Sequence, residues 1–226
     1  MAEFDLWWAI PLLMALMVGG ICPAAGSLLI TQRRILLANL MAHSVLPGLV
    51  VAIALEVDPS IGGLISGLIG ALVAERLNQR FRGREEGAMN TVLAGFTALG
   101  VLLVPLLKAR IDLESILFGD ILAAGGIDLV RTGVAALALV LLFTTRYQDL
   151  VFIGVDPEGA IAAKHPVSQV RFTAIVITAL VVISAITAVG IVLVIGLLCA
   201  PVLVHVERST SPVSYTHLTL PTNREV

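Results

Sequence analysis

Ala38-Asn39-Leu40-Met41-Ala42-His43-Ser44-Val45-Leu46-Pro47-Gly48 is a largely apolar stretch that carries an amide, an imidazole and a proline at intervals of four residues. It continues into an apolar run, and together they predict a membrane-spanning helix over residues 36–55. In a helix, Asn39, His43 and Pro47 share one face. Pro47 also removes the hydrogen bond to the carbonyl group of His43, so we expect a kink there. A polar patch of this kind inside a membrane is a candidate functional site.

The polar atoms of this patch suit a metal ion. The imidazole of His43 and the side-chain oxygen of Asn39 are candidate ligands for a first-row divalent cation such as zinc or manganese. Two ligands do not complete a site, so any further ligands would come from other helices. The alternative is that both side chains form hydrogen bonds to neighbouring helices. Spacing alone leaves both interpretations open.

The composition indicates an integral membrane protein. Of the 226 residues, 58% are hydrophobic and 13% are charged, which is about half the charged fraction of a soluble domain. Cys22 and Cys199 lie in apolar runs, as buried cysteines do. No basic patch of the kind that binds nucleic acid is present in the sequence. We therefore expect lipid, and no nucleic acid, around this chain.

Apolar runs predict an all-α fold of about seven transmembrane helices within residues 1–208. These runs cover residues 6–30, 36–55, 61–77, 88–107, 129–145, 172–188 and 191–205. A tight turn at Val189-Gly190 separates the last two. Residues 112–120 are too short to span, and we expect a re-entrant or interfacial helix there. Gly63, Gly67 and Ala71 form a stripe of small residues that favours tight helix packing.

The distribution of lysine and arginine predicts the orientation. One set of alternate loops holds most of these residues: Arg33, Arg34, Arg76, Arg80, Arg82, Arg84, Arg146, Lys164, Arg171 and Arg208. The other set holds Lys108, Arg110 and Arg131. The richer side is expected to face the cytoplasm. This places the N-terminus outside and residues 146–171 in the cytoplasm.

Residues 33–48 resemble the signature of the permease subunits of zinc/manganese/iron ABC importers, whose core His-Ser-Val-Leu-Pro-Gly is present here from His43 to Gly48. Three further stretches are similar to the same family in the same order: residues 85–100, 156–160 and 189–201. Two departures stand out. The arginine pair lies one residue closer to the histidine, and Asn39 stands where the family has aspartate.

The resemblance implies a polytopic permease of the cytoplasmic membrane that transports zinc, manganese or iron and holds no permanent cofactor. It implies a homodimer, a cytoplasmic ABC ATPase and an extracytoplasmic metal-binding protein as partners. By position, His43 would be a metal ligand, and Asn39 would weaken the site by removing a negative charge. The family also has one more helix, so we expect an eighth to be missing here.

The segment from Asp156 to Pro166 is amphipathic, mixed in charge and bracketed by prolines. One interpretation is a solvated connector. The other is the segment that couples the permease to the ATPase, with Asp156, Pro157, Glu158 and Lys164 as the contact residues. The predicted cytoplasmic location favours the coupling role.

Other classes of protein fit the sequence less well. The chain has no Gly-x-x-x-x-Gly-Lys-Ser/Thr motif, so we expect it not to be an enzyme and a partner to hydrolyse ATP. An intramembrane metalloprotease would need a His-Glu-x-x-His helix, which the sequence lacks. A permease for a metal chelate, of the siderophore or cobalamin type, and a gradient-driven metal carrier remain as alternatives.

The apolar pattern stops near residue 209. Residues 209–226 are rich in Ser, Thr and Pro, and residues 213–222 look like translated sequencing adapter. We therefore expect a non-native tail and a native chain that continues beyond Arg208, the alternative being a polar cytoplasmic tail.

Overall fold

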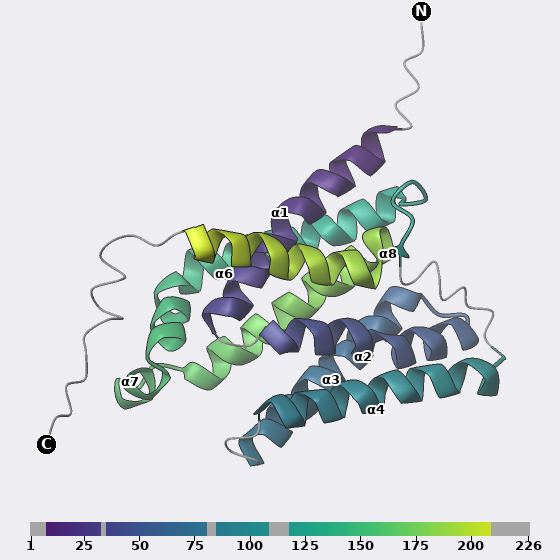
Figure 1. Cartoon of the computed structure of the whole chain (residues 1–226). Coiled ribbons are helices and arrows are strands. Elements are labelled where there is room, and N and C mark those ends of the chain that lie inside the picture. Colours follow the sequence, from purple (N-terminus) through teal and green to yellow (C-terminus); the bar gives the residue numbers. More distant parts are fainter. Residues whose placement is uncertain (1–7, 33–34, 81–84, 109–117, 209–226) are drawn as a thin grey trace, which may run out of the picture.

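The computed structural model describes residues 8–32, 35–80, 85–108 and 118–208, and within these ranges the chain forms helices and no strand (Figure 1). The helices are α1 (Ala9–Thr31), α2 (Ile35–Ala54), α3 (Pro59–Arg80), α4 (Glu85–Leu106), α6 (Gly126–Val155), α7 (Pro157–Ala162) and α8 (Val167–Arg208). Except for the short α7, each is long and apolar enough to cross a membrane. The predicted all-α membrane fold is therefore confirmed. The tail at 209–226 and most of the interfacial helix predicted at 112–120 lie outside the described residues.

A break divides α8 at the position where the sequence predicts a turn. Gly190 has φ of 76° and ψ of 165°, a conformation that glycine adopts without the steric cost of a Cβ atom. Figure 1 shows the two parts of α8 running in different directions. Residues 167–189 and 191–208 thus correspond to the sixth and seventh predicted helices, which the structure joins in one broken element.

The helix that carries the candidate site is the most enclosed of the membrane spans. Of the residues in its apolar window, 67% are buried, against 17% for α4. It packs against α1, α3, α4 and α8, and Leu37, Leu40, Met41 and Val45 are almost fully inaccessible. The candidate site therefore rests on a firmly packed helix beside a helix, α4, that has a large open surface.

α2 and α3 cross in direct backbone contact. A Cβ atom added to Gly48 would lie 2.0 Å from the carbonyl oxygen of Gly62, and one added to Gly62 would lie 2.2 Å from that of Gly48. Any larger residue at either position would push the helices apart. The predicted small-residue stripe also packs closely, since Gly63 lies against Val45. The closest approach, however, uses the neighbouring face of α3, which carries Gly62.

Candidate functional site

The structure places Asn39, His43 and Pro47 at successive turns of α2, as the four-residue spacing predicts. Asn39 and His43 are both half-buried, and Pro47 is buried. α2 continues as one helix through Pro47. The expected juxtaposition of an amide and an imidazole on one helix face is therefore present, while a role for these residues in metal binding stays a prediction.

His43 opens onto a hollow of about 610 Å³ beside α4, which we call the His43 hollow. The residues that line it are His43, Leu93, Ala94, Thr97, Ala98, Val101 and Leu102. All but His43 come from one face of α4, and most are apolar. The hydroxyl of Thr97 already donates to the carbonyl oxygen of Leu93 at 2.8 Å. The imidazole of His43 is thus the polar side-chain group in the hollow that is available to a bound ligand.

One nitrogen of His43 is buried without a partner. Within the part of the chain that the structure describes, Nδ1 of His43 has no hydrogen-bond partner. Buried polar atoms in proteins are nearly always paired, so an orphaned imidazole nitrogen calls for a ligand, a water or a partner group. Across the same described ranges, no three His, Cys, Asp or Glu side chains gather closely enough to hold a metal ion. His43 is therefore, at most, one part of a metal site.

The backbone beside His43 is fixed by a contact that the sequence analysis missed. The hydroxyl of Ser66 on α3 donates to the carbonyl oxygen of Ser44 at 2.6 Å, and both residues are buried. A Cβ atom on Gly70, one turn further along α3, would lie 2.4 Å from the hydroxyl oxygen of Ser44. The sequence does carry a signal for this contact: Gly62, Ser66 and Gly70 recur at intervals of four residues, one position before the stripe of Gly63, Gly67 and Ala71.

The predicted coupling segment forms the short helix α7. Asp156 caps its start by accepting a hydrogen bond from the backbone N–H of Gly159 at 2.8 Å, Pro157 occupies the first turn, and Glu158 follows in that turn. These choices fit a helix N-terminus, where a capping carboxylate and an early proline both stabilise the first turn. Lys164 lies just past the helix with φ of 61°. The four predicted residues therefore belong to one compact, exposed unit.

Asp149 and His165 hold this unit to α6. α6 leaves helical geometry at Arg146, and beyond that point Oδ1 of Asp149 lies 2.8 Å from Nδ1 of His165. Arg146 donates to the same carboxylate at 3.3 Å, and the ring of Phe152 meets His165 edge to face at 5.2 Å. Below them, Leu150, Ile153, Ala160, Val167 and Val170 share a buried cluster. α7 is thus anchored to the ends of α6 and α8.

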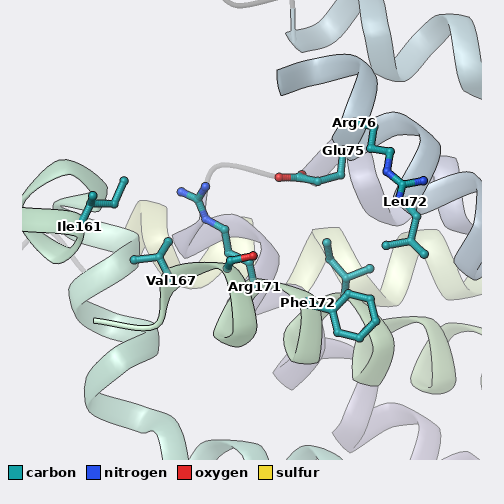
Figure 2. Close-up of a pocket in the computed structure, with 9 residues that line it drawn as sticks. Leu72, Glu75, Arg76, Ile161, Val167, Arg171 and Phe172 are labelled. Carbon is teal, nitrogen blue, oxygen red and sulfur yellow. The ribbon is translucent and has the colours of Figure 1, made fainter. Parts of the chain in front are cut away.

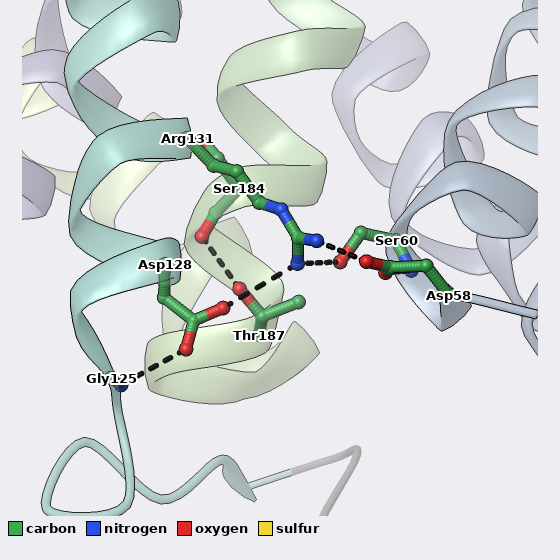
Figure 3. Close-up of polar contacts among 7 residues, drawn as sticks. All are labelled: Asp58, Ser60, Gly125, Asp128, Arg131, Ser184 and Thr187. Atoms are coloured by element: carbon green, nitrogen blue, oxygen red, sulfur yellow. Dashed lines mark hydrogen bonds and ion pairs between the residues drawn. The ribbon is translucent and has the colours of Figure 1, made fainter.

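A polar cluster joins the start of α3, and the loop that precedes it, to the start of α6 (Figure 3). Arg131 forms an ion pair with Asp58, donates to the hydroxyl of Ser60 at 2.9 Å and lies 3.7 Å from Asp128. Asp128 in turn accepts from the backbone N–H of Gly125 at 3.0 Å. Desolvation would raise the pKa of Asp58. The hydrogen bond from the backbone N–H of Ser60 and the guanidinium of Arg131 outweigh it and hold that pKa below its ordinary value.

Residues 6–215 match the model of the ABC 3 transport family. The chain is 34% identical over 188 residues to the manganese transport system membrane protein MntC of Halalkalibacterium halodurans, covering 83% of this chain and 64% of that protein. It is 28% identical over 187 residues to the chelated iron transport system membrane protein YfeD of Yersinia pestis, covering 83% of this chain and 63% of that protein.

A solved structure supports the same assignment. The structure of PsaBC from Streptococcus pneumoniae in complex with Fab superposes with a TM-score of 0.78 and 28% identity, over 94% of this chain and 76% of that one. The chain spans less than two thirds of the length of the two sequence relatives. The match to the family model nevertheless includes every described helix. The chain belongs to the ABC 3 transport family.

Proposed function

We propose that this chain is the membrane-spanning permease subunit of an ATP-driven importer, and that its cargo is a divalent transition metal. Family membership and the names of relatives that transport manganese or chelated iron support this proposal. The observation that carries it to specific residues is His43 itself, which lines an apolar hollow and whose Nδ1 atom is buried without a hydrogen-bond partner among the described residues. A neutral imidazole is a good ligand for manganese, iron or zinc.

In this proposal the cargo passes His43 and does not stay bound. Asn39, one turn earlier, supplies a neutral oxygen donor, so the site carries no formal negative charge. Such a site binds a divalent cation more weakly than one with a carboxylate, because it lacks the attraction between opposite charges. Weak binding suits a transport pathway, from which the ion must also leave.

The ligand set would be completed by a second copy of the chain. The described residues hold no cluster of three candidate metal ligands, and the outer surface of α4 beside the His43 hollow is exposed and apolar. A homodimer that buries this surface would bring two His43 side chains to one pathway. We place the metal site at such an interface.

Energy would come from a cytoplasmic ABC ATPase, since the sequence carries no nucleotide-binding motif of its own. Its docking point would be α7 with Asp156, Pro157, Glu158 and Lys164, a unit that is exposed yet braced against α6 and α8. Because α7 packs against α6 and α8, a movement of the ATPase would be transmitted to these helices, whereas a flexible loop would not transmit it. An extracytoplasmic metal-binding protein would deliver the ion to the opposite face.

A metal chelate is the second candidate cargo. The His43 hollow measures about 610 Å³ and is mostly apolar, which is larger and less polar than a bare ion requires. A chelate would bring its own ligands and would leave His43 without a role in coordination.

Binding of manganese to the purified full chain distinguishes the two cargoes. Electron paramagnetic resonance reports free Mn²⁺ directly, so loss of the free signal measures binding. We expect the wild-type chain to bind Mn²⁺, Asn39→Asp to bind it more tightly, and His43→Ala to lose binding. Equal binding of free Mn²⁺ by His43→Ala and wild type would contradict the role of His43. Absence of binding in all three would favour the chelate.

A further inference from the structure

The break in α8 at Gly190 is buried in the protein. Its φ of 76° and ψ of 165° form a combination that is essentially restricted to glycine. Val189 and Ile191, on either side, expose 6% and 1% of their surface. Sparsely populated backbone conformations persist only where the surrounding structure holds them, and they are frequent in segments that move during function. The contacts around Gly190 therefore set the angle between the two parts of α8.

Gly119, in the segment before α6, lies directly against this break. A Cβ atom added to Gly119 would lie 2.8 Å from the Cα atom of Val189 and closer still to the backbone nitrogen of Gly190. The φ of Gly119 is 70°, so a larger residue would also strain its own backbone. Because the two backbones meet with no side chain between them, a displacement of one must displace the other.

Residues 119–125, which we call the Gly119 loop, have a defined shape. The carboxylate of Asp120 accepts hydrogen bonds from the backbone N–H of Leu122 at 3.0 Å and of Ala123 at 3.2 Å. The side chain of Ile121 packs against the main hydrophobic core. The loop therefore meets the break in α8 as an ordered unit.

The first part of α8, residues 167–189, connects this contact to α7. It begins a few residues after α7 and continues as a helix to the break, over about 34 Å at 1.5 Å per residue. Figure 1 shows α7 and the loop before α6 at opposite ends of the molecule. The distribution of basic residues assigns α7 to the cytoplasmic side. A single helix thus joins the predicted cytoplasmic face to the Gly119 loop.

The two ends of this first part are packed differently. Near the break, Val181 and Val182 are completely buried. Near α7, a cleft of about 410 Å³ lies between α3 and α8 (Figure 2), and its lining includes Leu72, Ile161 and Phe172. The helix is therefore held firmly near the break and has free space beside its α7 end, which allows that end to tilt.

We propose that Gly190 is a hinge, and that the Gly119 loop sets the angle between the two parts of α8. A tilt of the first part, started at α7, changes this angle and displaces the loop. Hinges are commonly a few residues at the ends of elements that absorb changes of φ and ψ. The link to transport rests on the proposed function, in which α7 contacts the ATPase.

The test is double electron–electron resonance on the purified full chain with Cys22→Ala and Cys199→Ala, carrying spin labels at two introduced cysteines. Thr173→Cys in the first part and Val204→Cys in the second report the angle, and both positions are exposed. Val204 lies about 21 Å along the helix from the hinge, so a change of about 10° moves its label by about 4 Å. Thr173→Cys with Thr187→Cys is the control pair within the first part, and its distance should stay constant.

Gly119→Ala should shift the distance between Thr173 and Val204 by about 4 Å, because the new methyl group overlaps the backbone at the break. Gly126→Ala is the matched control, since no atom lies within 4 Å of a Cβ added there. Asp120→Ala removes the acceptor that shapes the loop without adding bulk, and should broaden the distance distribution, whereas Asp120→Asn keeps an acceptor and should not. Distributions in Gly119→Ala and Asp120→Ala that match Gly126→Ala would overturn the proposal.

His165→Ala tests the transmission from α7, because it removes the contact that holds this segment to α6. It should broaden the same distribution, and an unchanged distribution would overturn the link between α7 and the hinge. Binding of Mn²⁺, measured on the same proteins, separates this inference from the proposed function. Gly119 does not line the His43 hollow, so Gly119→Ala should bind Mn²⁺ like wild type. A response of the hinge in a chain that binds no Mn²⁺ would contradict the metal cargo and still support the hinge.

Discussion

The hydroxyl of Ser66 donates to the carbonyl oxygen of Ser44 at 2.6 Å, and this bond joins α3 to α2 one residue after His43. Both serines are buried. Close by, Gly48 and Gly62 allow the two backbones to touch. The backbone at His43 is therefore held in place by α3 as well as by α2, and this sets the direction in which the side chain of His43 leaves the helix.

Ser66→Ala should reduce the free energy of unfolding by about 1 kcal/mol, the usual net value of one internal hydrogen bond. Thermal or denaturant unfolding of the purified chain in detergent measures it. Thr91→Ala is the control, because the hydroxyl of Thr91 bonds only within its own exposed turn, to the carbonyl oxygen of Gly87. An equal loss in both variants would show that the contact between α2 and α3 adds nothing specific.

Gly48→Ala should destabilise the chain by about 1–3 kcal/mol, because the new methyl group would overlap the carbonyl group of Gly62. Gly95→Ala provides the comparison, since no atom lies within 4 Å of a Cβ added there. The same unfolding measurement applies. If Gly48→Ala unfolds like Gly95→Ala, the helices do not cross as closely as described.

Much of this fold follows from apolar segment length. Runs of about 20 apolar residues are long enough to cross a membrane, and most of the observed helices begin and end near the predicted ones. The exception is α6, which continues past the predicted end at residue 145, through a break at Arg146, to Val155. The break at Gly190 was also predictable, because glycine follows valine between two such runs. The contact of Gly62 with Gly48 was not, because apolar runs do not specify which face of a membrane helix meets its neighbour.

Lowering the pH should remove the stabilisation that Asp58 contributes. Its pKa lies below the ordinary value of 3.8 in the folded chain, so the ion pair with Arg131 stabilises the fold fully above that value. The contribution is lost as the pH falls through the lower, folded pKa. The unfolding free energy of wild type should therefore fall more steeply below about pH 4 than that of Asp58→Asn.

Arg131→Gln supplies the second arm of this measurement, because it removes the partner and leaves the carboxylate. It should also flatten the acid dependence relative to wild type. Identical pH profiles for wild type and both variants would mean that the ion pair does not form in the folded chain.

The contact between Asp149 and His165 should control the order of α7. Hydrogen–deuterium exchange of backbone amides in residues 157–165 should become faster in His165→Ala, because the side chain that anchors this segment to α6 is lost. His165→Asn keeps a donor close to the position of Nδ1 and should retain more protection than His165→Ala. Exchange that is the same in all three proteins would contradict an anchoring role.

Less of the candidate site could be predicted than of the fold. Helical spacing placed Asn39, His43 and Pro47 on one face of α2, and the structure agrees. Sequence spacing does not show that α4 forms the rest of the His43 hollow, because that depends on how two helices pack. For the same reason, the approach of Asp149 to His165 across a break in α6 had no signal in the sequence.

In the proposed function, His43 lies on the path of the transported metal. The direct measurement is accumulation of radioactive manganese, iron and zinc by cells in which the native permease gene is replaced by a variant. Thr97→Ala is the control, because Thr97 lines the same hollow while its hydroxyl is bonded to its own helix. We expect His43→Ala to abolish uptake of at least one of these metals and Thr97→Ala to preserve it. Uptake of all three by His43→Ala at the wild-type rate, with equal amounts of protein in the membrane, would contradict it.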